Sequence, residues 1–389
     1  MRVSVVVPVC NPGPDIADLI ASLEAQTLDP SEFEVVFADD GSTDATPALL
    51  DAVAAKHPGF RVIHMSNSGS PGRPRNIGLD AAVGDYVFLS DHDDRLAPDA
   101  LERLADFADL HGSDVVIGKV VGVNRNAPDR IFARTLVDAQ EDPGLLMSSL
   151  TPQKLYRRAF LDARGIRFPE GRRRLEDHLF VTTAYLRARR VSVYADHPVY
   201  SFVLREDGRN ASRSAIEWQG YFANAAESIA MVDAEAPDEA TRVVMRARWL
   251  RTEAIGRLRG RRLVDQPDRD ALLDVVTELL RTHYPSTEVD RLGAADRLIG
   301  RLLLDGRRED VLELARWEAD IGVALTLLDA RTTADAVVAR VRAEARAPER
   351  TPAFLDALPP GYPSRAAVLR TARLGPRATM TARYRRRTG

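Results

Sequence analysis

The first 90 residues alternate between short apolar runs and amphipathic runs, and this alternation limits the folds open to the chain. The apolar runs are rich in β-branched or aromatic residues and predict strands at residues 3–9, 33–38, 60–65 and 86–90. Apolar residues at helical spacing between these runs predict helices over residues 15–26, 45–56 and 74–82. Such alternation produces a parallel sheet with helices on both faces, so the expected fold class is α/β.

Polar and turn-forming residues lie at the end of each predicted strand or in the loop that follows it. They occupy residues 8–12, 39–44, 69–78 and 91–94, and consist mainly of Pro, Gly, Asp and Asn. The carboxyl ends of parallel strands meet at one edge of a sheet, and ligands of such sheets bind outside that edge. We therefore expect a binding site built from these four segments.

Three carboxylates lie within four residues at the end of the fourth predicted strand, on Asp91, Asp93 and Asp94. Carboxylates this close repel one another and resist the loss of water unless a divalent cation lies among their oxygens. The two-residue step allows Asp91 to face the sugar of a ligand while Asp93 faces a metal bridging its phosphates. The alternative is a solvated acidic turn that caps the following helix, and the short pattern alone does not separate the two.

Two other loops carry charges that suit a nucleotide. Asp39 and Asp40 could accept hydrogen bonds from a nucleobase N–H and a ribose hydroxyl, or could instead cap the helix that follows them. Arg75 lies among small residues at the start of a predicted helix, and both an arginine and a helix N-terminus suit a diphosphate. The alternative for Arg75 is an exposed basic loop.

Together these segments resemble family 2 glycosyltransferases of the GT-A fold. The resemblance rests on residues 6–9, 38–44, 75–78 and 91–94 in the expected order, and it covers residues 1 to about 214. It implies a Rossmann-like, mostly parallel sheet and an inverting transferase. It also implies a nucleotide-diphosphate sugar as donor, most often a UDP-sugar, and Mn²⁺ or Mg²⁺ as cofactor.

The resemblance implies roles for individual residues as well. Asp93 would bind the metal. The donor would contact Pro8 and Val9 through its base, Asp39 or Asp40 through uracil and ribose, Arg75 and Asn76 near the diphosphate, and Asp91 near the ribose or sugar.

Glu176 and Asp177 precede apolar residues at helical spacing and resemble the Glu-Asp motif of the family, in which the aspartate is the base. An inverting transfer needs one group that takes the proton of the acceptor hydroxyl. We expect Asp177 to be that base and Glu176 to orient a neighbour. The alternative is a pair of acidic residues that only complement the helix dipole.

Three further residues are candidates from the same resemblance. His197 follows a predicted strand and would either complete the metal site or have a structural role. Arg205 and Arg209 lie in a stretch that looks like the closing loop of the family. Either arginine could cover the diphosphate, and the sequence does not choose between them.

The predicted domains are a catalytic domain over residues 1–214, a helical domain over 215–345, and a Pro/Ala-rich linker with an Arg-rich tail over 346–389. Residues 365–389 contain eight arginines and no acidic residue, although the whole chain has a net charge of −3. The tail would contact anionic lipid, or it is a disordered end of an arginine-biased sequence. Because nearly all basic charge is arginine, we interpret it as a composition bias and expect no nucleic-acid partner.

Cellular location is inferred from what the sequence lacks. The single cysteine, Cys10, excludes an internal disulfide, and no signal peptide or apolar stretch of about 20 residues is present. These features predict a cytoplasmic protein that is peripheral at the inner face of the cell membrane if its tail binds lipid.

The leading hypothesis is a metal-dependent, inverting hexosyl- or N-acetylhexosaminyl-type glycosyltransferase. It would move a sugar from a UDP-sugar to a hydroxyl of a cell-envelope glycan, a lipid-linked or a polyol-phosphate acceptor. One alternative is a degenerate, non-catalytic module that binds sugar nucleotides or glycans. Another is a nucleotidyltransferase, which would need a Gly-rich phosphate loop that residues 8–12 do not provide.

Overall fold

The computed structural model describes residues 1–204 and 216–326, and its contacts divide the chain into two compact units. The first unit is Met1–Met245 and the second begins at Arg246. The predicted closing-loop residues Arg205 and Arg209 and the predicted tail lie outside the described residues. The predicted domain boundary at residue 214 also lies outside the described residues and stays a prediction.

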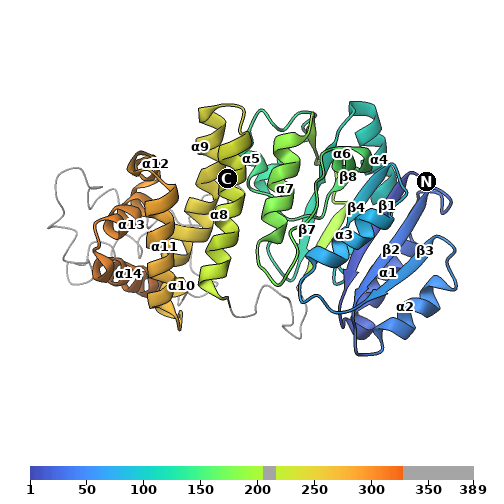
Figure 1. Ribbon diagram of the computed structural model, residues 1–389, viewed down its shortest axis with the longest axis horizontal. Coiled ribbons are helices and arrows are strands. Elements are labelled where there is room, and N and C mark those ends of the chain that lie inside the picture. The colour runs from blue at the N-terminus through green and yellow to red at the C-terminus, as the bar shows by residue number, and fades with distance from the viewer. Residues whose placement is uncertain (205–215, 327–389) are drawn as a thin grey trace. The chain divides into compact units, whose positions relative to one another are not determined.

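Seven strands form the main sheet of the first unit, in the order β3-β2-β1-β4-β8-β6-β9. Figure 1 labels β1, β2, β3, β4 and β8 of this sheet. All neighbouring strands are parallel except β8, which is antiparallel to β4 and β6. The predicted mostly parallel α/β sheet is therefore confirmed. The strands are β1 Val3–Val9, β2 Phe33–Asp40, β3 Phe60–Met65, β4 Tyr86–Leu89, β6 Val115–Gly118, β8 Leu155–Arg157 and β9 Val191–Tyr194.

The order of the strands determines where a ligand can bind. From β1 the chain builds outward through β2 and β3, and it then returns to place β4 on the other side of β1. This reversal is a topological switch point, and ligands of open α/β sheets bind outside the carboxyl ends of the strands there. All residues of β1 and β2 are buried, so both faces of the sheet are covered.

Helices cover the sheet, and close packing of one of them positions Arg75. In α3, a Cβ added to Gly78 would lie 2.3 Å from Cγ1 of Val6 on β1, so only glycine allows this approach. The helices of this unit are α1 Ala17–Glu24, α2 Thr46–Ala54, α3 Gly72–Ala81, α4 Ala100–His111, α5 Pro143–Leu146, α6 Arg158–Ala163, α7 Glu176–Arg187 and α8 Trp218–Glu235.

A small second sheet lies beside the functional loops, in the order β5-β10-β7. Its strands are β5 Arg95–Leu96, β7 Val120–Val123 and β10 Tyr200–Val203. The central strand β10 pairs with the segment that directly follows Asp94 and brings Tyr200 next to the acidic loop.

The described part of the second unit is helical and contains no strand. Its α-helices are α10 Arg261–Val264, α11 Arg269–His283, α12 Ser286–Asp290, α13 Ala294–Leu304 and α14 Arg308–Thr326, and α9 Glu239–Arg248 leads into it. A buried ion pair joins Arg246 to Glu288, Nε to Oε2, at 3.2 Å. The predicted helical C-terminal region is confirmed. Among the described residues, every helix is too short or too polar to cross a bilayer.

Candidate active site

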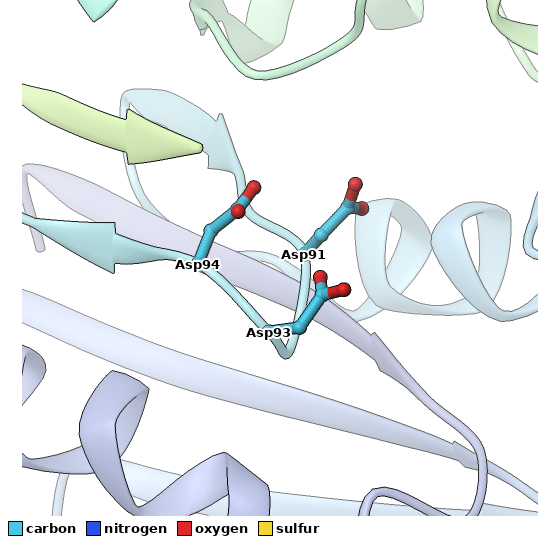
Figure 2. Close-up of side chains that lie close together, drawn as sticks. All are labelled: Asp91, Asp93 and Asp94. Carbon is cyan, nitrogen blue, oxygen red and sulfur yellow. The ribbon is translucent and has the colours of Figure 1, made fainter. Parts of the chain in front are cut away.

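Three aspartates meet on the turn that follows β4. One carboxylate oxygen from each of Asp91, Asp93 and Asp94 lies within 4.8 Å of the others, and Figure 2 shows the three carboxylates on the same side of the turn. Oxygen ligands of this kind suit Mg²⁺ and Mn²⁺. The cluster is the only group of its kind among the residues that the structure describes.

Asp94 is the most buried member of the cluster, with 4% of the residue exposed. Burial raises the pKa of Asp94 to about 8, and the negative charge of Asp91 acts in the same direction. Its Oδ1 accepts a hydrogen bond from the backbone N–H of Val203 at 2.9 Å, which ties the turn to the end of β10. A cation among these oxygens would offset the repulsion that raises this pKa, so the residues fit a divalent metal.

Arg75 joins two acidic loops that are far apart in sequence. Its Nη2 donates to Oδ1 of Asp91 at 2.9 Å, and its Nη1 donates to Oε1 of Glu176 at 3.1 Å. The guanidinium lies 5.1 Å from the ring centre of Phe168, and only 5% of the residue is exposed. Two predicted site residues, Asp91 and Glu176, therefore converge on the guanidinium of a third, Arg75.

The start of α7 presents the predicted base. Asp177 is partly buried and accepts a hydrogen bond from the backbone N–H of His178 at 2.9 Å. Burial raises the pKa of both Glu176 and Asp177, and Arg75 opposes the shift in each. The preceding Leu175 has φ of 62°, a left-handed conformation that bulky residues rarely adopt and that is typical of functional sites.

A segment over residues 149–154 contacts the acidic turn. Nε2 of Gln153 donates to Oδ2 of Asp91 at 2.6 Å, which is the second hydrogen bond to that carboxylate. Lys154 is 1% exposed, and burial lowers its pKa to about 7 although nearby Asp177 favours its charged form. Sequence reasoning assigned neither residue a role of its own, because Gln153 contacts a residue 62 positions away and the burial of Lys154 depends on the tertiary fold.

The predicted nucleotide-binding aspartates Asp39 and Asp40 end β2, and both are buried. Oδ2 of Asp39 lies 2.7 Å from Nδ1 of His64, and its Oδ1 accepts from the N–H of Ser42 at 3.0 Å. Both oxygens of Asp40 accept from Ser68, from its N–H at 2.8 Å and from its hydroxyl at 2.9 Å. Asp39 and Asp40 therefore also hold the surrounding loops, and their binding role stays a prediction.

The end of β1 lies beside both regions. Val9 is opposite Asp39 in the register of β1 and β2, and Pro8 and Val9 are both buried. A ring nitrogen of His92 lies 3.3 Å from the carbonyl oxygen of Pro8, so this strand end contacts the acidic turn. The structure thus brings the first, second and fourth predicted segments to one edge.

Asn76 makes contacts other than those the sequence predicted. Its side-chain amide donates to the carbonyl of Phe168 at 2.9 Å and accepts from the N–H of Phe168 at 2.8 Å. It is 7% exposed. Asn76 therefore holds the segment that carries Phe168 against α3, and its predicted contact with the donor stays a prediction.

His197 lies apart from the acidic cluster. Its Nε2 is 3.1 Å from Oδ1 of Asp99, and its Nδ1 is 3.0 Å from the hydroxyl of Tyr194. Both ring nitrogens are engaged, so its present contacts do not favour the predicted role as a ligand of the metal near Asp93. The residue that the sequence missed here is Tyr200, whose buried hydroxyl accepts from the N–H of Asp91 at 3.0 Å.

The mostly parallel sheet, with the acidic turn at its switch point, has the architecture of the GT-A fold. Residues 4–197 match the family described as glycosyl transferase family 2, and residues 218–315 match the glycosyl transferase TarS linker domain. The chain belongs to glycosyltransferase family 2.

The chain is also similar in sequence to two poly(ribitol-phosphate) glycosyltransferases. The chain is 36% identical over 224 residues to the poly(ribitol-phosphate) beta-N-acetylglucosaminyltransferase TarS of Staphylococcus aureus, covering 57% of this chain and 39% of that protein. It is 32% identical over 252 residues to the poly(ribitol-phosphate) beta-glucosyltransferase of Bacillus spizizenii, covering 64% and 40%. The chain thus spans about two fifths of the length of these relatives.

A solved structure agrees over a larger share of the chain. The crystal structure of S. aureus TarS residues 1–349 in complex with UDP-GlcNAc superposes with a TM-score of 0.73 at 28% identity. The match covers 83% of this chain and 92% of that one. The likeness therefore extends through both the sheet and the helical region that follows it.

Proposed function

We propose that this protein is an inverting glycosyltransferase that moves a hexose or N-acetylhexosamine from a UDP-sugar to a hydroxyl of a polyol-phosphate polymer of the cell envelope. The observation that carries the proposal is the convergence of Asp91 and Glu176 on Arg75, beside Asp177 and at the switch point of the sheet. The named substrates of the relatives support the donor and acceptor classes.

Asp177 would act as the general base. It takes the proton of the acceptor hydroxyl while the acceptor oxygen bonds to the anomeric carbon of the donor. The bond from that carbon to the diphosphate oxygen breaks, and UDP leaves with the electron pair. Because the attack comes from the side opposite the leaving group, the anomeric configuration inverts. Burial raises the pKa of Asp177, which makes its carboxylate a better proton acceptor than an exposed aspartate.

Arg75 would stabilise negative charge and order the site. A buried guanidinium next to a departing diphosphate offsets developing charge with little reorganisation. Glu176 holds one arm of Arg75, and Asp91 holds the other. This arrangement supports the sequence-based expectation that Glu176 orients a neighbour while Asp177 takes the proton.

The acidic turn would hold Mn²⁺ or Mg²⁺ through Asp93 with help from its neighbours. When bound, such a cation neutralises charge on the diphosphate. Asp91 already accepts hydrogen bonds from Arg75 and Gln153. We therefore assign Asp91 to contact with the donor sugar and Asp93 to the metal.

Thermal-shift measurements test the donor and the metal together. A ligand that binds only the folded state raises the melting temperature by mass action. We expect UDP-sugars, compared with GDP-, CDP- and dTDP-sugars, to raise the melting temperature most, and to do so only with Mn²⁺ or Mg²⁺ present. Asp93→Ala should remove the metal-dependent part of the shift.

Transfer is then measured with UDP-GlcNAc and UDP-glucose on poly(ribitol phosphate). Sugar incorporation with inverted configuration supports the proposal. Tight UDP-sugar binding without transfer to this polymer, and without donor hydrolysis, would instead favour a degenerate binding module. If none of the nucleotide sugars raises the melting temperature, the proposal that the protein binds a nucleotide-sugar donor is contradicted.

A further inference from the structure

We propose that Gln153 is a positioning residue that orients Asp91 toward the donor sugar, an inference that rests on the proposed function. Nε2 of Gln153 donates to Oδ2 of Asp91 at 2.6 Å, while Arg75 donates to Oδ1 at 2.9 Å. Each oxygen of the carboxylate therefore has one donor, and the group is held against rotation about its last bond.

The side-chain amide of Gln153 cannot be flipped without losing its hydrogen bond to Asp91. Asp91 accepts hydrogen bonds through both oxygens when ionised, so the nitrogen of the amide must face it. The other amide atom, Oε1, is buried and has no hydrogen-bond partner. The whole residue is only 5% exposed. A buried acceptor without a donor lowers the stability of the fold, and such groups recur where a site requires them.

Three polar side chains donate hydrogen bonds to the backbone next to Gln153. The hydroxyl of Tyr185 donates to the carbonyl of Ser149 at 2.6 Å, and that of Tyr156 donates to the carbonyl of Pro152 at 3.1 Å. Nζ of Lys154 donates to the carbonyl of Thr151. Three carbonyls within four residues thus have buried partners, so Gln153 extends from a rigid support.

This geometry limits what Asp91 can do. Each carboxylate oxygen has two lone pairs, and one on each is occupied by Arg75 or Gln153. The two remaining lone pairs point in fixed directions and suit hydroxyl groups of a sugar. Without Gln153, Oδ2 is free to turn, and Asp91 can move toward Asp93 and Asp94, which lie in the same cluster.

The test compares Gln153→Leu with Gln140→Leu. Gln140 is a matched control because its amide is fully used in the fold: Nε2 donates to the carbonyls of Tyr185 and Ala188 at 3.3 and 3.1 Å, and Oε1 accepts from the N–H of Val191 at 3.2 Å. The measurements are melting temperature, affinity for UDP and for UDP-GlcNAc in the presence of Mn²⁺, and kcat/KM for donor turnover.

For Gln153→Leu we expect an unchanged or higher melting temperature, because an unpaired buried oxygen is removed. We expect kcat/KM for the UDP-sugar to fall about 10- to 100-fold, the usual effect of losing a hydrogen bond to a charged group. Affinity for UDP, which lacks the transferred sugar, should change less than about twofold, since Asp91 would act on that sugar and not on the ribose. Gln140→Leu should lower the melting temperature and leave kcat/KM of the folded protein unchanged.

Three results would overturn the inference: a melting temperature of Gln153→Leu that falls as far as that of Gln140→Leu, equal losses of UDP and UDP-sugar affinity, or unchanged kcat/KM. If the unaltered protein turns over no UDP-sugar, the proposed function fails. The comparison of melting temperatures then still decides whether Gln153 is held at a cost to stability or is an ordinary structural residue.

Discussion

At the scale of single residues, the environment of Asp177 favours reactivity over stability. Its carboxyl is partly buried, and burial raises its pKa although Arg75 lies nearby. A carboxyl whose folded pKa exceeds its unfolded value binds a proton more tightly when folded. The folded state therefore loses stability as the pH rises through these two values, and above both the loss is complete.

The first prediction follows from this loss of stability with rising pH. Asp177→Asn keeps the shape of the side chain and the oxygen that accepts from His178 N–H, but removes the buried charge. At pH 7 to 8 we expect a higher melting temperature than in the unaltered protein, and the gain should vanish below about pH 4. Sugar transfer should fall by about 10²- to 10⁴-fold, the usual contribution of a general base.

Calorimetry across the pH range and a transfer assay check both parts. UDP affinity serves as the control, since the base is not expected to contact the nucleotide. Full transfer activity in the variant would place the base elsewhere.

At the scale of elements, close packing of α3 on β1 positions the arginine of the site. Gly78 faces Val6, and an added Cβ would lie 2.3 Å from Cγ1 of that side chain. Arg75 is one turn earlier on the same helix. Any displacement of α3 from the sheet therefore moves Arg75 away from Asp91 and Glu176.

We accordingly expect Gly78→Ala to destabilise the protein by about 1–3 kcal/mol, as other overpacked cores are. It should also weaken UDP-sugar binding, because the helix carrying Arg75 must shift. Urea unfolding and isothermal titration measure the two effects. Asp80→Ala on the exposed side of the same helix is the control, with an expected change below about 1 kcal/mol. Unchanged stability in Gly78→Ala would show that the contact is relaxed in solution.

At the scale of the whole molecule, the chain consists of two units with separate cores. The second unit contains an ion pair in which Arg246 is 2% exposed and Glu288 is 6% exposed. The hydroxyl of Tyr284 also donates to the backbone carbonyl of Arg246, at 3.0 Å. Removing one partner of a buried ion pair leaves an uncompensated charge in the core.

Glu288→Ala should therefore destabilise the second unit by about 3–5 kcal/mol. The site residues named above all lie in the first unit. The affinity of the variant for UDP-sugars should therefore persist at temperatures where the first unit stays folded. Asp274→Ala, which removes an exposed partner of Arg308 at 2.6 Å, is the matched control and should cost at most about 1 kcal/mol. Differential scanning calorimetry measures both variants. Equal melting curves for the two would contradict the prediction.

The Arg-rich tail gives a prediction that depends on the sequence alone. Each arginine near an anionic membrane surface contributes about 1 kcal/mol of attraction. Deleting residues 365–389, which contain eight arginines, should therefore reduce co-sedimentation with anionic liposomes at low salt. Neutral liposomes are the control. Equal binding by the full chain and the shortened chain would exclude the tail as a membrane contact.

Local patterns in the sequence were sufficient for β1 to β4 of the main sheet and for the identity of the acidic groups, whereas β6 and β8 were not predicted. Strand β3 was predicted with its observed bounds, Phe60–Met65, and β2 was predicted two residues short. Residue periodicity is a local property of the backbone, so it can be read without a partner strand. The same holds for the acidic turn, because three carboxylates within four residues repel one another in any fold.

Only the tertiary structure determined which groups contact each other. Arg75 and Glu176 are 101 positions apart, and Gln153 and Asp91 are 62 apart. Their contacts exist because β8 is inserted next to β4 and because α7 begins beside α3. Strand order and register set such pairings, and periodicity carries no information about them. The same reason explains why the sequence did not predict the contacts of Asn76 with Phe168 or those of His197 with Tyr194 and Asp99.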